Sequence, residues 1–164
     1  MNSEQFLLLS HCLLNQTVRA GGAYNPGVGE KLLTLLGQYQ TYIYQLPCPE
    51  YLFLGERDKK PQDVWEKMEG FKKFCSDLAL EVKKRCEKII EGKVPILIAI
   101  ARSPSCSASQ VQRGKRLVEG RGLWILELEK KLNFDIIEFD FKKVKESLYR
   151  LKDILNKRAN YFGA

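Results

Sequence analysis

The sequence is poor in histidine, with only His11 among its 164 residues, and it has no apolar run of membrane-spanning length. A single imidazole excludes metal sites built from several histidines. Catalysis by a Cys–His or Ser–His pair would also have to use His11 as its base. Because His11 is adjacent to Cys12 in the sequence, it is poorly placed to take a proton from that thiol. The most apolar stretch, residues 94–101, is far shorter than the ~20 residues that cross a bilayer, so we expect no membrane segment.

Several common motifs are missing as well. No two cysteines have the Cys-x2-Cys spacing that is typical of structural zinc sites. Residues 21–29 are rich in glycine and precede an expected helix, but they match neither the Walker A pattern nor GxGxxG. This stretch indicates a tight turn, or an anion held at a helix N-terminus. The first residues lack the basic start and long apolar run of a secretory signal, so we expect a cytoplasmic protein.

The composition is that of an ordinary soluble protein. Hydrophobic residues make up 45% of the chain and charged residues 29%, which is typical of a globular domain. The length predicts one domain over residues 1–164. Five cysteines, an odd number without a secretory signal, do not indicate a disulfide framework.

The net charge of +7 favours an anionic partner such as nucleic acid, nucleotide or phosphate. A lysine-coated surface that keeps the protein soluble is the alternative. Basic residues concentrate around Cys106, with only Glu119 to offset them: Arg102, Arg113, Lys115, Arg116 and Arg121. If the substrate carries phosphate or is a tRNA, we expect Arg113, Lys115, Arg116 and Arg121 to contact it.

Apolar runs alternate with helical patterns along the chain. Continuous apolar or β-branched runs predict four strands, at residues 6–10, 41–46, 94–101 and 135–139. Helical periodicity predicts helices at residues 27–36, 61–91 with a break at Gly70, 117–132 and 142–160. This order predicts a single-domain α/β fold of the Rossmann-like kind, a mainly parallel open sheet with helices on both faces. Residues 51–60 are expected to form an excursion beside the site.

Two of the cysteines follow the spacing of a helical core. The apolar face of the long helix comprises Phe71, Phe74, Cys75, Leu78, Val82, Cys86 and Ile89. Cys75 and Cys86 are therefore expected to pack in the core as small apolar side chains. The core face of the last helix is expected to carry Val144, Leu148, Leu151 and Leu155.

The other three cysteines each follow a predicted strand. Cys12, Cys48 and Cys106 lie in short loops after the strands at residues 6–10, 41–46 and 94–101. In an open α/β sheet, ligands gather at the carboxyl ends of parallel strands. Because neighbouring strands are only about 4.8 Å apart, these loops can bring three thiolates together. The sequence therefore predicts a metal or iron–sulfur site at this edge.

Alternatives to an iron–sulfur enzyme stay open at this point. A Cys3His zinc site would need His11 as its fourth ligand. His11 adjoins Cys12, however, and adjacent residues seldom bind the same ion. A basic RNA-binding module with such a structural zinc site is one alternative. A non-enzymatic iron–sulfur or sulfur-carrier protein is another.

Three segments resemble the signature segments of the 2-thiouracil desulfurase (TudS) family. They are His11-Cys12-Leu13-Leu14-Asn15, Pro47-Cys48-Pro49-Glu50 and Ser103-Pro104-Ser105-Cys106. The resemblance implies a [4Fe-4S] cluster held by Cys12, Cys48 and Cys106, with one iron left open for the sulfur of a thiolated nucleobase or nucleoside. The sequence departs from the family at Asn15 and Val18, where a glycine and a further cysteine are usual, and at Ser107, where a glycine is usual.

The resemblance also suggests which residues act on the substrate. Water would attack the ring carbon of a thiouracil-type compound, and hydrosulfide would leave without net redox change. Glu50 is expected to move protons, with a helix-cap or ion-pair role as the alternative. Arg19 is expected to orient the pyrimidine or a phosphate, and Ser103 to hydrogen-bond a cluster sulfur or the substrate.

Overall fold

The computed structural model describes residues 4–161. Its main sheet has four parallel strands in the order β2-β1-β3-β6, and a two-stranded antiparallel sheet pairs β4 with β5. The strands are β1 (Gln5–Leu9), β2 (Thr41–Gln45), β3 (Ile96–Ile100), β4 (Gln110–Arg113), β5 (Arg116–Glu119) and β6 (Asp135–Phe139). The α-helices are α1 (Val28–Leu36), α2 (Pro49–Leu54), α3 (Gln62–Lys67), α4 (Phe71–Ile90), α5 (Leu123–Glu129) and α6 (Val144–Tyr161).

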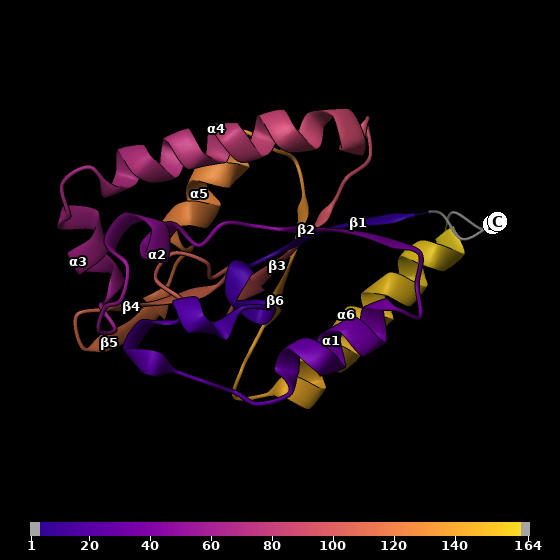
Figure 1. Cartoon of the computed structure of the whole chain (residues 1–164), viewed down its shortest axis with the longest axis horizontal. Coiled ribbons are helices and arrows are strands. Elements are labelled where there is room, and N and C mark those ends of the chain that lie inside the picture. The colour runs from indigo at the N-terminus through magenta and orange to yellow at the C-terminus, as the bar shows by residue number, and fades with distance from the viewer. Residues whose placement is uncertain (1–3, 162–164) are drawn as a thin grey trace.

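The sheet lies between two layers of helices, with α4 and α5 on one side and α1 and α6 on the other (Figure 1). β1 and β3 are buried along their whole length, because helices cover both faces of these central strands. Alternate side chains divide between two cores. Leu7 and Leu9 pack with α1 and α6, whereas Leu8 and Leu97 pack with α4 and α5. The predicted parallel α/β architecture is confirmed.

The predicted break in the long helical region is confirmed. Gly70, with φ of 84°, separates α3 from α4. Cys75 and Cys86 are both buried on α4, as expected. Ile89 is 37% exposed, so its assignment to the core face is wrong.

Two further segments differ from the sequence prediction. A helix was expected from residue 117, but residues 116–119 form β5, which pairs with β4 across a turn at Gly114. The excursion expected at residues 51–60 begins within a helix, α2. No helix among residues 4–161 is long and apolar enough to cross a membrane.

Candidate functional site

The three predicted cysteine loops lie at the same edge of the sheet. Cys12 is in a 3-10 turn after β1, Cys48 caps the start of α2 after β2, and Cys106 follows β3. Because these three strands are neighbours and run parallel, their carboxyl ends converge. The order across the edge is Cys48, Cys12, Cys106.

The thiols are close enough to influence one another electrostatically. Burial raises the pKa of Cys12 to about 12, and the nearby Cys48 adds to this rise. Burial also raises the pKa of Cys106 well above its usual value, with added contributions from Cys48 and Cys12. The pKa of Cys48 is raised by burial as well. Three such thiols ionise together only when a positively charged group offsets their mutual repulsion, as bound metal does.

Three cysteine thiols are a donor set that can hold an iron–sulfur cluster. Within residues 4–161, no group of three His, Cys, Asp or Glu side chains is arranged around one metal position. In a cluster each thiolate ligand binds its own iron, so the ligands surround a larger group instead of meeting at one point. All three cysteines are free of disulfides, and each residue is half-buried.

His11 is engaged in structural hydrogen bonds. Its Nδ1 lies 3.0 Å from the Leu46 carbonyl, to which it donates, and its Nε2 accepts from Asn15 Nδ2 at 3.2 Å. These partners assign the neutral tautomer with the proton on Nδ1. Both ring nitrogens of His11 are thus engaged within the protein, and the side chain ties the Cys12 turn to the end of β2.

The Cys106 loop is folded by its own polar groups. Ser103 Oγ accepts hydrogen bonds from the amides of Cys106 at 3.0 Å and Ser105 at 3.4 Å. Ser107 is fully buried, and it is not among the residues with positive φ. A serine therefore fits at this position without backbone strain, where the resemblance of the motif would lead us to expect glycine.

The same loop rests on the start of α5. Gly122 N donates to Ser107 O, and the amides of Leu123 and Trp124 donate to Pro104 O and Ser105 O at 3.0 Å. These carbonyls satisfy the amides that begin α5.

Arg102, at the start of the Cys106 loop, has φ of 62°. Its guanidinium donates two hydrogen bonds, of 2.8 and 2.6 Å, to the Asp140 carboxylate. The loop is thus held at both ends, by Arg102 and by the start of α5.

Glu50 lies beside the thiols as a buried ion pair. Its Oε2 accepts from Arg57 Nη2 at 2.9 Å, and both side chains are largely shielded from solvent. Burial raises the pKa of Glu50, while Arg57 and Ser105 act in the opposite direction. Ser105 Oγ forms no hydrogen bond of normal geometry. It lowers the pKa of Glu50 because it lies close to that carboxyl group. The charge of Glu50 acts in turn on Cys12, Cys48 and Cys106.

Arg19 lies close enough to Cys12 to act on its pKa. Its guanidinium stacks 3.9 Å above the Phe141 ring and donates to Asn25 Oδ1 at 2.6 Å. The positive charge of Arg19 lowers the pKa of Cys12, although burial prevails. The structure therefore places Arg19, Glu50 and Ser103 next to the three cysteine loops.

The basic stretch lies on the β4–β5 hairpin and just after it. Arg113 pairs with Glu66 at 2.6 Å, and Arg121 pairs with Glu129 at 2.9 Å. Lys115 and Arg116 are exposed and take part in none of the ion pairs found among residues 4–161. Two of the four predicted phosphate contacts are thus engaged within the protein.

Sequence reasoning missed three residues that shape the site. Arg57 anchors Glu50 and also donates to Val18 O at 2.8 Å. Gln62 donates to Pro104 O and Arg121 O, joining the Cys106 loop to the hairpin. Gly122 supports that loop through its backbone. Only Gly122 has a sequence signal, a glycine directly before an apolar helical run.

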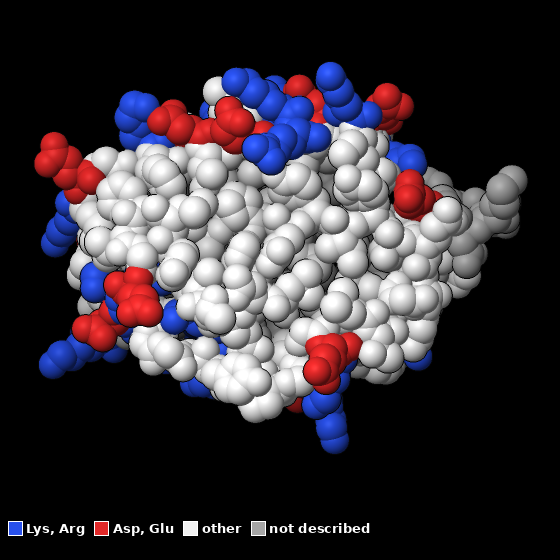
Figure 2. Space-filling model, in the orientation of Figure 1, with Lys and Arg blue, Asp and Glu red and all other residues white. Residues whose placement is uncertain are grey.

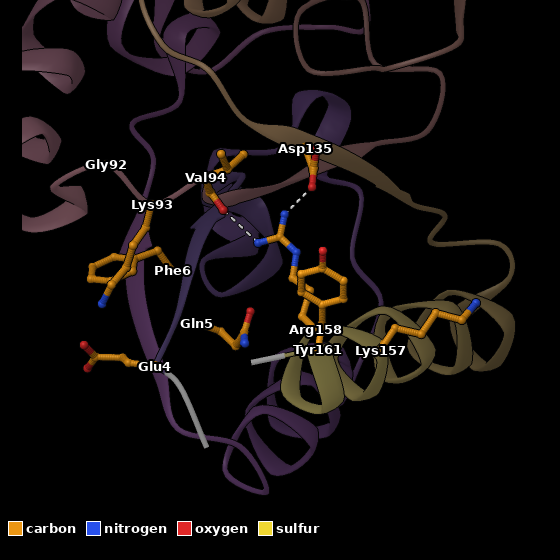
Figure 3. A pocket seen from close by; sticks show the side chains of 10 residues that line it. All are labelled: Glu4, Gln5, Phe6, Gly92, Lys93, Val94, Asp135, Lys157, Arg158 and Tyr161. Atoms are coloured by element: carbon orange, nitrogen blue, oxygen red, sulfur yellow. Dashed lines mark hydrogen bonds and ion pairs between the residues drawn. The ribbon is translucent and has the colours of Figure 1, made fainter. Parts of the chain in front are cut away.

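A cavity of about 560 Å³ lies at the opposite edge of the sheet. Its lining includes Phe6, Val94 and Asp135, near the amino ends of β1, β3 and β6. In Figure 3, Arg158 reaches from α6 to the Val94 carbonyl and the Asp135 carboxylate. No cysteine lines this cavity, so it is separate from the thiol site.

Comparison with known proteins agrees with this architecture. No family model matches the sequence. An uncharacterized protein of Methanocaldococcus jannaschii is 27% identical over 168 residues, which cover 96% of this chain and 98% of that protein. The solved structure of a [4Fe-4S]-dependent thiouracil desulfidase, TudS, aligns with a TM-score of 0.54 and 19% identity over 90% of this chain and 97% of its own. The resemblance indicated by the cysteine motifs is thus confirmed at the level of the fold, which this chain shares with a thiouracil desulfidase.

Proposed function

We propose that this protein is an iron–sulfur-dependent desulfidase that removes sulfur from a thiolated pyrimidine base or nucleoside. The observation that carries the proposal is the convergence of Cys12, Cys48 and Cys106 at one edge of a sheet with the desulfidase fold. These three thiolates would hold a [4Fe-4S] cluster. When bound, the cluster supplies a Lewis acid for the substrate sulfur at the iron without a protein ligand.

The reaction is a hydrolysis in which atoms and electrons balance. The thiocarbonyl carbon gains the oxygen of water and loses its sulfur as hydrosulfide, with no change in redox state. Glu50 is the proton carrier in this proposal. Arg57 binds its Oε2, so Oε1 is the oxygen left to exchange a proton in this proposal. The raised pKa of Glu50, which results from burial, suits a carboxyl group that exchanges a proton.

Two further residues position the substrate in this proposal. Ser103 Oγ accepts from the Cys106 amide, which leaves its own proton for donation to the pyrimidine. Arg19 is held over the ring of Phe141, and its planar guanidinium can bind a carbonyl oxygen or a phosphate oxygen of the substrate. If the substrate is a thiolated tRNA, Lys115 and Arg116 are the cations near Cys106 in sequence that remain available to its phosphates.

The test is anaerobic purification and reconstitution of the full chain, followed by iron and sulfide counts, an absorption spectrum and an assay of sulfide release. We expect about four irons per chain and release of sulfide from 2- or 4-thiouracil compounds. Cys→Ala at position 12, 48 or 106 should remove both cluster and turnover, whereas Cys86→Ala should retain both. An intact cluster that leaves every thiouracil and thiouridine unchanged would contradict desulfidase activity and favour a carrier role.

A further inference from the structure

The outer edge of β2 is an open strand edge. β2 is the first strand of the order β2-β1-β3-β6, and no other strand within residues 4–161 pairs with its outer side. Figure 1 views the molecule from this side, with β2 in front of the other strands of the main sheet. Unpaired backbone groups on such an edge are a template for pairing with another strand.

The residues that carry the free backbone groups follow from the ladder with β1. Gln40 O accepts from Gln5 N, and Leu46 N donates to Leu9 O. Alternation along the strand directs the N–H and C=O of even-numbered residues toward β1. Thr41, Ile43 and Gln45 therefore present their N–H and C=O groups to the outside.

This edge lacks the features that normally prevent strand pairing. Its sequence, Thr-Tyr-Ile-Tyr-Gln, contains no charge, proline or bulge, and its β-branched and aromatic residues favour β-structure. The opposite edge strand, β6, carries the carboxylates of Asp135 and Glu138. Asp135 pairs with Arg158, and Glu138 accepts from the amides of Ala108 and Ser109. Of the two edges that the main sheet has within residues 4–161, the β2 edge is the unprotected one.

The surface around β2 is also unusually free of charge for a chain with a net charge of +7. Figure 2 shows a broad uncharged area across the middle of this face, with Lys, Arg, Asp and Glu gathered at its upper and lower margins. Two copies of a strongly positive protein repel each other least where such faces meet. Tyr42, next to the central Ile43 of β2, is 38% exposed.

We propose that this edge is a homodimer interface in which β2 pairs antiparallel with β2 of a second copy. The two-fold axis passes between the two Ile43 residues. Ile43 then faces its own copy, and Thr41 faces Gln45, as hydrogen-bonded pairs of an antiparallel ladder. This register uses every outward N–H and C=O of Thr41, Ile43 and Gln45 in both copies. It also sets Tyr42 opposite Tyr44, a favourable aromatic cross-strand pair.

The dimer is closed and leaves both thiol sites open. An isologous contact about a two-fold axis uses up the β2 edge of each copy, so growth stops at two. Antiparallel pairing points the carboxyl ends of the two sheets in opposite directions, which places the two cysteine sites at opposite ends. A five-residue strand is small against the about 800 Å² per partner of a standard interface, so we expect dissociation in the micromolar range, ~1–100 µM.

The test compares two double variants of the full chain by sedimentation equilibrium over a range of concentrations. Thr41→Lys with Gln45→Lys sets like charges opposite each other across the axis, and we expect at least tenfold weaker dimerisation. Thr41→Glu with Gln45→Lys sets opposite charges there and should restore the dimer. Both variants remove the same native side chains, including Gln45, which donates to His11 O, so they are matched, and circular dichroism confirms their folding.

Ionic strength provides an independent measurement. Because both copies are positive, added salt should strengthen the wild-type dimer by screening their repulsion. A wild-type protein that stays monomeric at millimolar concentration would overturn the proposal. So would a dimer that both double variants leave unchanged, or open-ended association beyond two copies.

Discussion

Gly122 lies so close to Ser105 that a β-carbon built on it would be 2.2 Å from the Ser105 carbonyl carbon. The same β-carbon would be 2.5 Å from the Cys106 amide nitrogen. Both neighbours are backbone atoms, which cannot turn aside as a flexible side chain can. The Cys106 loop thus packs directly against the backbone of Gly122, the residue that precedes α5.

We therefore predict that Gly122→Ala displaces the Cys106 loop. The variant should lose at least about 2–3 kcal/mol in free energy of unfolding, because overpacking against backbone is costly. It should also bind less iron after reconstitution. Gly120→Ala is the control, since its β-carbon would meet only the Val111 side chain, at 3.2 Å. Urea unfolding and iron counts on both variants check this, and equal stability would contradict it.

A second prediction separates the site cysteines from the core cysteines. Cys48→Ala should abolish iron binding with little effect on apo-protein stability, because Cys48 is only half-buried and lies in a loop at the sheet edge. Cys86→Ala should keep the iron but lower the unfolding free energy by about 1–2 kcal/mol, because it removes a buried group from α4. Iron counts and thermal unfolding distinguish the two. If Cys86→Ala lost its iron while Cys48→Ala kept it, the assignment of Cys48 to the site and Cys86 to the core would be refuted.

The third prediction concerns pH and Asp140. The Arg102 guanidinium lowers the pKa of Asp140 to about 2, whereas an unfolded aspartate titrates near 3.9. A lowered folded-state pKa contributes stability above the unfolded pKa, and this is lost as pH falls from about 4 to 2. Asp140→Asn should cost roughly 1–2 kcal/mol at pH 7, after allowance for solvent screening. The difference from wild type should shrink toward pH 2 in urea unfolding.

The fourth prediction concerns Glu50. Glu50→Gln should lower kcat by about 10²-fold or more, with iron content and KM changed little. Since the pKa of Glu50 is raised, its carboxylate is lost at a higher pH than that of an ordinary glutamate. If Glu50 acts as a base, wild-type turnover should therefore decline as the pH is lowered. The pH profile of the Glu50→Gln variant should lack this acid-side decline. A variant with wild-type kcat would exclude Glu50 from proton transfer.

The fifth prediction concerns RNA. Lys115→Glu with Arg116→Glu should weaken binding of thiolated tRNA and flatten the slope of log affinity against log salt by about 0.7 to 0.9 for each phosphate that is no longer neutralised. Turnover of the free base should be spared. Arg113→Glu is not a clean substitute, because it breaks the ion pair with Glu66 that holds the hairpin to α3. Unchanged tRNA binding would show that the hairpin is only a solvated surface.

The positions of the strands along the chain and the loops of Cys12, Cys48 and Cys106 could be predicted because both depend on local pattern. Buried parallel strands are continuous apolar runs, and their ends mark the sheet edge. The β4–β5 hairpin was missed, although its strands flank a turn at Gly114. The residues from Leu117 onward also have helical periodicity, and this pattern concealed the short, polar strands of the hairpin. In the folded protein, contacts of Arg113 with Gln62 and Glu66 favour the hairpin.

The pairing of Arg57 with Glu50 had no such local signal. Arg57 reaches its partner only after α2 has turned the chain back toward the site. The hydrogen bond of His11 to Leu46 likewise joins two loops that are distant in sequence. Contacts of this kind depend on the assembled sheet, so composition and periodicity do not reveal them.

The positions of the three cysteines along the chain also determine when during synthesis all three become available. Cys12 follows β1, the central of the three strands, and its two neighbours across the edge follow β2 and the later β3. On the ribosome, Cys12 and Cys48 emerge long before Cys106, and the third loop takes its shape only when Gly122 and the start of α5 have followed. If the three cysteines hold the proposed cluster, its donor would meet all three ligands only late in synthesis, when most of the new chain has been made.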